Sequence, residues 1–150
     1  MLRMYHGTTS KNLDKLIKTG SEKLYLTMDE DQAQYYAECA SEDDESEPKI
    51  IVVEICESML FADTPSFDEP LTYILNYNNL NESEWHEAIN SGEIKYPSIK
   101  DWKTSLKYTK NVIAIGNIKP EQILGEDASL TEEDIKRVEL LFVKVKKMKS

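Results

Sequence analysis

The pattern of apolar and polar positions predicts short strands and helices in irregular order. A helix is indicated over residues 11–19, because apolar residues recur there at helical spacing, with Ser10 as its cap and Gly20 at its end. A second helix begins after Asp29, whose side chain can cap it. The apolar run at 50–53 indicates a strand buried on both faces. The strands predicted for this half cover residues 2–6, 24–27 and 49–55.

The second half of the chain has a less regular pattern. Asn81 and Glu84 form a capping box for a helix that runs through Ile89 and ends near Gly92. Further predicted elements are helices over 71–75, 97–107 and 131–135, strands over 111–115 and 138–145, a turn at 116–117 and a charged loop over 41–48. Because strands and helices do not alternate regularly, we predict an α+β fold, as a single domain over residues 1–150.

Composition narrows the function classes. The chain has 150 residues, 40% of them hydrophobic and 31% charged, as in an ordinary globular protein. Its formal net charge of −10 disfavours a nucleic-acid ligand, because such binding rests on neutralised phosphates. No segment approaches the ~20 apolar residues that cross a bilayer, and the start of the chain lacks the apolar run of a signal peptide. The chain contains two cysteines, Cys39 and Cys56, which are expected to be buried or half-buried thiols. Because free thiols are typical of a reducing compartment, a cytoplasmic location is expected.

Candidate chemistry begins at His6 and Gly7, where the first predicted strand ends. Histidine offers a donor and an acceptor nitrogen, and glycine exposes its backbone N–H and C=O, which together suit a carboxamide. Tyr25 lies on the second predicted strand, and Tyr35 and Tyr36 lie on the following helix. A flat cationic ring such as nicotinamide is well held between aromatic faces. The residues alone also allow a structural histidine and tyrosines of an ordinary core.

These residues, in this order, resemble the ADP-ribosyltransferase fold of the diphtheria toxin and poly-ADP-ribose polymerase branch. The resemblance rests on Tyr5-His6-Gly7-Thr8-Thr9, on Leu24-Tyr25-Leu26-Thr27 and on Ala33-Gln34-Tyr35-Tyr36-Ala37, within roughly the first 40 residues, and more loosely on 49–55 and 111–123. It implies a split two-sheet core with flanking helices that binds NAD as a substrate. It implies no metal, and the sequence contains no paired Cys/His cluster.

The resemblance assigns roles to individual residues. It implies that His6 bonds the ribose on the adenosine side and that the Gly7 backbone bonds the nicotinamide carboxamide. Tyr25 is expected to pack on nicotinamide, with Tyr36 as the second stacking ring, or Tyr35 if the helix is rotated by one residue. The other residues expected at the cofactor site are Thr8, Thr27 and Ala33.

One position departs from the family pattern. Asn111 stands where these transferases carry a glutamate that stabilises positive charge on the ribose as nicotinamide leaves. An asparagine can orient a hydroxyl but supplies no full charge, which is expected to slow the reaction by ~10²–10³. The acids considered as substitutes are Glu54, Glu121 and Glu139. The catalytic set expected from the sequence is therefore His6, Tyr25 and Asn111.

The function expected from the resemblance is NAD-dependent mono-ADP-ribosylation of a macromolecular target, as in a toxin or an effector of phage–host conflict. The acidic surface favours a protein target over a nucleic acid, and no membrane partner is expected; the oligomeric state stays open. The alternatives are an inactive module that binds NAD or ADP-ribose, and an acidic inhibitor of a basic partner. Removal of a 2′-phosphate from RNA is disfavoured, because the N-terminal half offers few basic residues.

Overall fold

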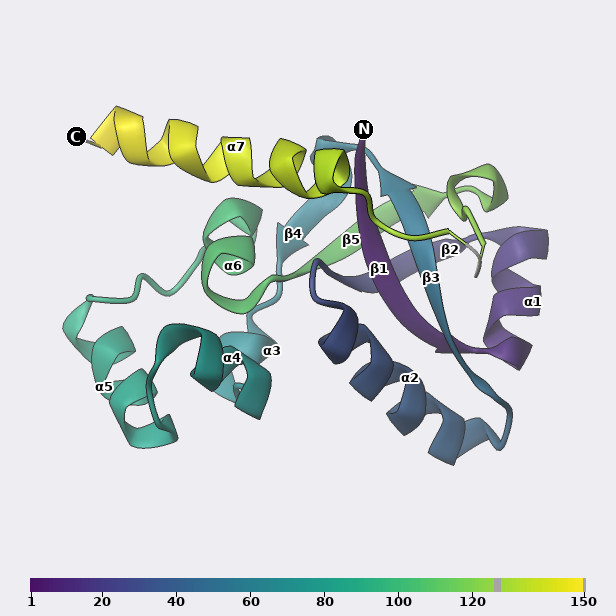
Figure 1. Ribbon diagram of the computed structural model, residues 1–150, viewed down its shortest axis with the longest axis horizontal. Helices are drawn as coiled ribbons and strands as arrows, with labels where there is room; N and C mark the ends of the chain where they lie inside the picture. Colours follow the sequence, from purple (N-terminus) through teal and green to yellow (C-terminus); the bar gives the residue numbers. More distant parts are fainter. Residues whose placement is uncertain (126–127, 150) are drawn as a thin grey trace.

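A five-stranded antiparallel sheet forms the centre of the α+β fold. The computed structural model describes residues 1–125 and 128–149, with side chains up to residue 141. The strands follow the order β3-β1-β2-β5-β4, and every neighbouring pair is antiparallel (Figure 1). Their bounds are β1 (Leu2–Thr9), β2 (Ser21–Thr27), β3 (Pro48–Ile55), β4 (Leu60–Ala62) and β5 (Asn111–Ile118). The short β4 does not appear in the sequence pattern.

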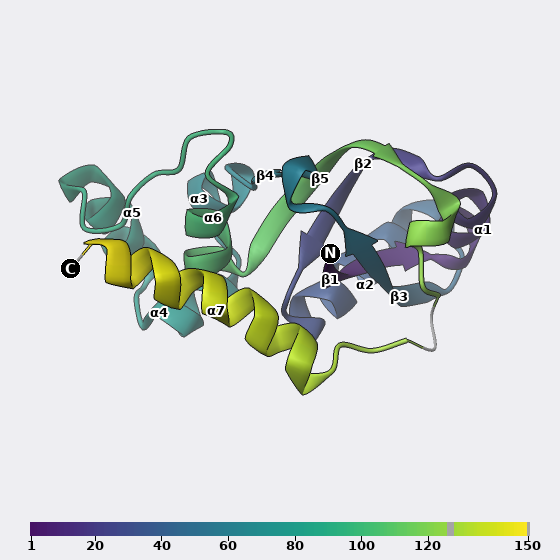
Figure 2. The ribbon, with the colours of Figure 1, turned by 90° about the horizontal axis from the view of Figure 1, so that it is seen from above.

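Helices cover both faces of the sheet. Their bounds are α1 (Ser10–Thr19), α2 (Glu30–Asp44), α3 (Pro65–Asp68), α4 (Thr72–Asn78), α5 (Glu82–Ser91), α6 (Trp102–Thr109) and α7 (Glu132–Lys149), with 3-10 turns at Glu57–Met59 and Pro120–Gln122. One face buries Met4, Leu26 and Val53 with residues of α1, α6 and α7. On the other face, Ala33 of α2 packs against Tyr5 and Val52. Figure 2, seen from above, shows that α7 runs along one side of the molecule.

A second, smaller core lies beyond the β4 edge, among α3, α4 and α5 (Figure 1). It consists of Phe67, Ile74, Trp85, Ala88 and Ile94, and Phe67 and Trp85 are fully buried. The Trp85 indole N–H donates to the Phe67 carbonyl at 2.9 Å, so the polar edge of this large ring is satisfied. The molecule thus contains a sheet core and a helical core.

The predicted last strand over 138–145 is wrong, because this segment belongs to α7. Thr131 and Asp134 bond each other's backbone N–H groups, as in a capping box, and so start a helix. Asp134 and Val138 are buried and Leu141 is half-buried, a spacing of three to four residues. This burial pattern is the helical repeat, so the segment is part of a helix rather than a strand.

Other boundaries also differ from the expectations. The acidic run 41–48 is partly helical, because α2 continues to Asp44, whose carboxylate accepts from the Thr9 hydroxyl and, at 2.9 Å, from the Ser46 N–H. The turn predicted at 116–117 lies inside β5, opposite an irregularity in β2. Thr9, rather than Ser10, caps α1. The helix expected over 97–107 begins only at Trp102, after an Asp101 cap.

The remaining expectations have mixed outcomes. The predicted Asp29 cap and the Asn81–Glu84 capping box are confirmed, and β3 has the buried apolar run that its sequence indicated. Both cysteines are exposed, contrary to the expectation of buried thiols. The expected division into two sheets is not observed, because the described strands form one sheet, in which β1 and β2 share the single register pair Tyr5 and Thr27.

Candidate functional site

The seam between β1 and β2 is where the sheet opens. β1 pairs with β3 along its whole length, whereas the described register between β1 and β2 consists of the pair Tyr5 and Thr27. Beyond Tyr5 the two strands separate. The His6 ring bridges them, with Nδ1 lying 2.8 Å from the carbonyl oxygen of Tyr25. A side chain thus takes the place of a backbone ladder bond at the opening.

This bond fixes the tautomer of the neutral imidazole. A carbonyl oxygen can only accept, so His6 Nδ1 carries the proton and Nε2 is the acceptor nitrogen. Burial lowers the pKa of His6 below its usual value, and the bond to Tyr25 opposes that shift. His6 is therefore neutral at pH 7 and presents an acceptor for an incoming hydroxyl.

A cavity of about 450 Å³ opens at this seam, with two walls. The sheet wall consists of His6, Gly7, Tyr25 and Tyr36, from β1, β2 and α2. The α3 wall consists of Asp63, Pro65, Ser66, Glu69 and Leu71, from the segment between β4 and α4. The size and the mixed apolar and polar lining suit a small organic ligand.

The two tyrosines of the sheet wall differ in burial. Tyr25 is 46% exposed and can offer its ring to a ligand. Tyr36 is half-buried, and burial, followed by the nearby Asp63, raises the pKa of its hydroxyl to about 12. The Tyr36 hydroxyl therefore stays neutral near pH 7, and both rings provide aromatic faces or edges.

Gly7 allows α2 to lie directly against β1. A Cβ added at Gly7 would collide with the carbonyl oxygen of Ala33 and would lie 2.8 Å from the Ala37 nitrogen. Because both contacts are to helix backbone, no side-chain rotation relieves them. Gly7 is thus needed for the close packing of α2 against β1, and it also lines the cavity.

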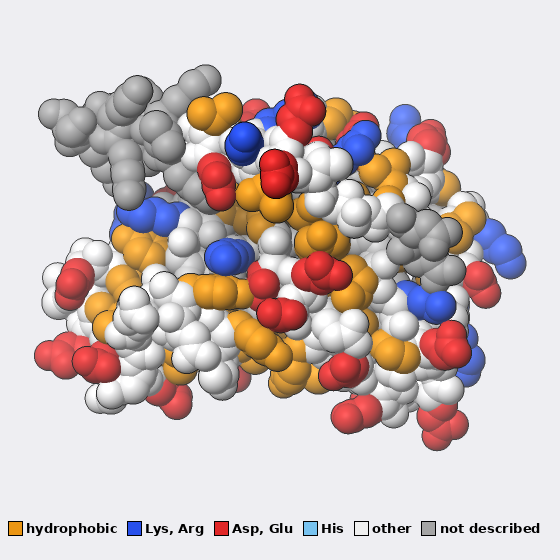
Figure 3. All heavy atoms as spheres, in the orientation of Figure 1, with side chains coloured by type: hydrophobic (Ala, Val, Ile, Leu, Met, Phe, Trp, Pro, Cys, Tyr) orange, Lys and Arg blue, Asp and Glu red, His pale blue; other side chains and the backbone are white. Residues whose placement is uncertain are grey.

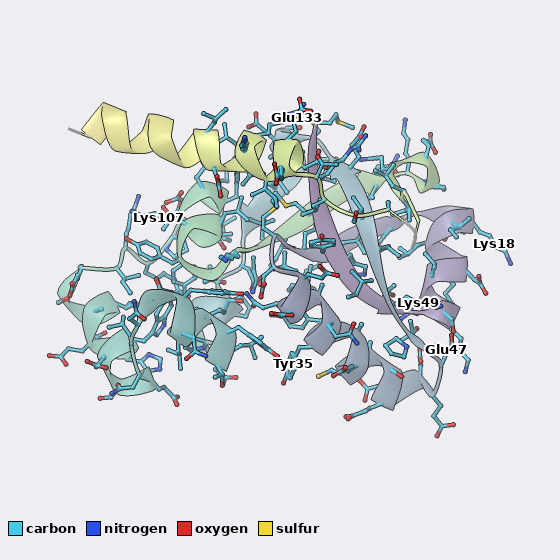
Figure 4. The ribbon with its side chains drawn as sticks, viewed as in Figure 1. Lys18, Tyr35, Glu47, Lys49, Lys107 and Glu133 are labelled. Carbon is cyan, nitrogen blue, oxygen red and sulfur yellow. The ribbon has the colours of Figure 1, made fainter. Side chains whose placement is uncertain are left out.

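Four residues expected at the cofactor site lie outside this lining. Thr8 is buried in β1, and the Thr27 hydroxyl donates to the Lys110 carbonyl at 3.2 Å. Ala33 is fully buried between α2 and the sheet. Tyr35 lies on the side of α2 toward α4 (Figure 4), with its ring 6.4 Å from that of Tyr73. Of the two neighbouring tyrosines, Tyr36 is the one that lines the cavity.

Asn111 lies behind the cavity rather than on its surface. It is 1% exposed, and its Nδ2 donates to Gln32 Oε1 at 2.8 Å. The same amide lies 3.3 Å from Ser66 Oγ and 3.4 Å from the Tyr36 hydroxyl, which joins the two walls. Gln32 continues the network by donating to the Thr109 carbonyl at 3.0 Å. The residue thus holds the cavity's lining in place.

The Asn111 Oδ1 atom is a buried oxygen without a hydrogen-bond partner among the described residues. Such an atom costs about 1–3 kcal/mol of folding free energy. Most buried polar groups in folded proteins are hydrogen-bonded, so this oxygen, directly behind the cavity, is an exception.

The acids considered as substitutes for the missing glutamate do not line the cavity. Glu54 forms an ion pair with Arg3 at 3.0 Å, and Glu121 and Glu139 are exposed. The acids that do line it are Asp63 and Glu69. Sequence reasoning missed both, because they follow the three-residue β4.

A local signal could have revealed the α3 wall. Asp63-Thr64-Pro65-Ser66 places an acid and a proline where a short helix can begin. Asp63 accepts from the Ser66 N–H at 3.4 Å and from its hydroxyl at 2.9 Å, as that pattern suggests. The segment could have been predicted as a helix start, although not as a cavity wall.

A larger cavity, of about 650 Å³, lies in the helical region. Its acids are Glu84, Glu87 and Glu93, and none of the candidate site residues expected from the sequence lines it. In the part of the chain that the structure describes, no three histidine, cysteine or acidic side chains gather to hold a metal ion. Among the same residues, no helix has the length and apolar character to cross a membrane.

No protein-family model matches the chain, and a search of the curated proteins found no match.

Proposed function

We propose that the chain binds NAD at the β1–β2 seam as a small ADP-ribosyltransferase-like protein. The observation that carries the proposal is that His6, Gly7, Tyr25 and Tyr36 line one cavity, although they come from three separate elements. In this proposal the sheet is that of an ADP-ribosyltransferase, and its seam corresponds to the boundary between the family's two sheets.

The chemistry of the sheet wall suits the nicotinamide half of NAD. Tyr25 and Tyr36 offer aromatic surface, and a cationic ring gains about 0.5–2 kcal/mol on such a face. Gly7 brings backbone to the wall with no side chain in front of it, as a carboxamide partner must. The neutral His6 offers Nε2 to a ribose hydroxyl, because its Nδ1 proton is directed to Tyr25.

In the active form of this proposal, the nicotinamide–ribose bond breaks and one ADP-ribose passes to a macromolecule, with a cytoplasmic protein favoured as target. Positive charge shifts onto the ribose as neutral nicotinamide leaves, and the acceptor's nucleophilic atom forms the new bond and loses a proton. Tyr25 packs on the nicotinamide end of the bond that breaks, and His6 holds NAD by the ribose on the adenosine side. Asn111 acts as a positioning residue through Tyr36 and Ser66.

A second candidate is binding of NAD or ADP-ribose without transfer. The specific observation in its favour is that Asn111 is buried and uncharged at the start of β5. The inhibitor alternative has less support, because acidic side chains are spread over the face in Figure 3 rather than gathered into one patch.

Binding and labelling separate these candidates. Calorimetry with NAD should give saturable binding that Tyr25→Ala and His6→Ala remove, with Tyr35→Ala as an exposed aromatic control. A cell lysate with labelled NAD should then show a modified target. Binding without labelling favours the inactive module, and no binding by the folded protein overturns the NAD proposal.

A further inference from the structure

Asp63 is a buried acid that faces the cavity from the end of β4. Its side chain is 3% exposed, and its backbone N–H donates to Ser105 Oγ at 2.9 Å. Since Ala62 pairs with Val112, the next residues along the ladder are Asp63 and Asn111. The carboxylate therefore stands beside the position where the sequence led us to expect a negative charge.

The hydrogen bonds of Asp63 leave part of its carboxylate unused. One oxygen accepts from the Ser66 N–H and the other from the Ser66 hydroxyl. An ionised carboxylate has about four acceptor sites, so two more remain for a ligand. Burial raises the pKa of Asp63, while the Ser66 bonds and the charge of Lys23 oppose that shift.

The charges around the cavity are unbalanced. Its lining contains two acids, Asp63 and Glu69, one neutral histidine and no lysine or arginine among the described residues. Lys23 is the neighbouring cation, and its ammonium lies 5.1 Å from the centre of the Tyr25 ring. Two tyrosine rings with a nearby buried carboxylate form a setting that favours a cation over a neutral molecule.

We propose that Asp63 makes this cavity selective for a cationic pyridinium ring over a neutral ring of the same shape. The inference rests on the proposed function and names the charge state of its ligand: oxidised rather than reduced NAD. Because Asp63 is buried, its charge is screened less than that of an exposed carboxylate. Glu69 is exposed at the rim and contributes less.

The matched ligands for the test are 1-methylnicotinamide, a cation, and nicotinamide, its neutral counterpart. NMR titration of the intact chain should show the cation binding about tenfold more tightly. In Asp63→Asn this preference should fall to within about twofold, because the charge is lost while the new amide oxygen can accept from the Ser66 N–H and its NH₂ can donate to the Ser66 hydroxyl. Asp14→Asn on the exposed face of α1 is the charge-matched control.

Lowering the pH supplies a readout that a merely structural role would not move. The preference in the wild type should fade as Asp63 gains a proton, and it should fade less in Asp63→Asn, in which His6 still gains a proton. The other groups that face Asp63 are His6, Lys23, Tyr25, Tyr36 and Glu69. Because Glu69 is the second acid of the cavity lining, Glu69→Gln is the control, and it must keep the pH dependence if Asp63 is its source.

The outcomes distinguish this inference from the proposed function. Equal binding of the cation and the neutral ring overturns the role of Asp63 and leaves NAD binding intact. A preference that survives in a folded Asp63→Asn protein also overturns it. If NAD and both rings fail to bind, the proposed function fails first. Chemical-shift spectra of each variant establish that it is folded.

Discussion

The sheet wall and the α3 wall face each other across one cavity but are built differently. The sheet wall is neutral and aromatic, and its residues belong to long elements anchored in the sheet core. The α3 wall is acidic and consists of residues of a four-residue helix and of the segments that flank it, and Phe67 anchors that helix in the helical core. In the function proposed above, shape recognition and charge recognition therefore depend on two separate cores. Changes confined to one core should therefore affect one wall first.

Phe67→Ala should have the largest effect. Removing this fully buried ring is expected to cost about 3–5 kcal/mol of unfolding free energy. Because Phe67 packs 5.8 Å from Trp85, hydrogen exchange should accelerate in α4 and α5 more than in β1 and β3. Phe67→Leu, which keeps much of the volume, should cost less. Equal loss of protection in both regions would argue against two separate cores.

Gly7→Ala should damage the sheet wall instead. Its Cβ meets the α2 backbone, so we expect a loss of about 3 kcal/mol, measured by urea unfolding. Gly92→Ala is the control, because no atom lies within 4 Å of its Cβ and only its positive φ of 84° is strained. That control should cost about 1–2 kcal/mol. A cost at Gly7 no greater than at Gly92 would contradict the close approach of α2.

Tyr36→Leu and Tyr35→Leu sharpen the assignment of the aromatic wall. Loss of the Tyr36 ring should weaken NAD binding by about tenfold, since an aromatic contact contributes about 0.5–1.5 kcal/mol beyond its area. The Tyr35 ring lies outside the cavity, so its variant should bind within twofold of the wild type. Calorimetry measures both, and a larger loss at Tyr35 would reverse the assignment.

The smallest expected effect is the pH dependence of His6. Its folded-state pKa lies below the unfolded value of about 6.5, so the unfolded state binds the proton more readily. The unfolding free energy should therefore fall as the pH drops below about 6.5, toward the folded-state pKa. His6→Asn should reduce this slope between pH 6.5 and 5, as denaturant titrations would show. An unchanged slope would contradict a half-buried, neutral His6.

Residue pattern predicted the secondary structure around the sheet wall. Gly20 ends α1, Asp29 caps α2, and the apolar run of β3 is buried, because each depends on local chemistry. A shared site for His6, Tyr25 and Tyr36 was expected from the family resemblance, since the residues alone also allowed a structural histidine and tyrosines of an ordinary core. The burial of Asn111 could not be foreseen, since it depends on Gln32 and Ser66 from distant segments.

The α3 wall could not be predicted in the same way. β4 is three residues long and α3 is four, so neither carries a full period of apolar residues. Their positions depend on pairing with β5 and on the burial of Phe67, which are long-range contacts. The same limit explains the error at α7, where a continuous apolar run concealed a helical repeat.

The most direct test of the account is a titration of the isotopically labelled chain with NAD, followed through backbone amide shifts. The account predicts saturable shifts at Tyr25 and Tyr36 of the sheet wall and at Ser66 of the α3 wall, with Glu87 of the larger cavity unchanged. Shifts confined to the larger cavity, or none at millimolar NAD, would contradict it.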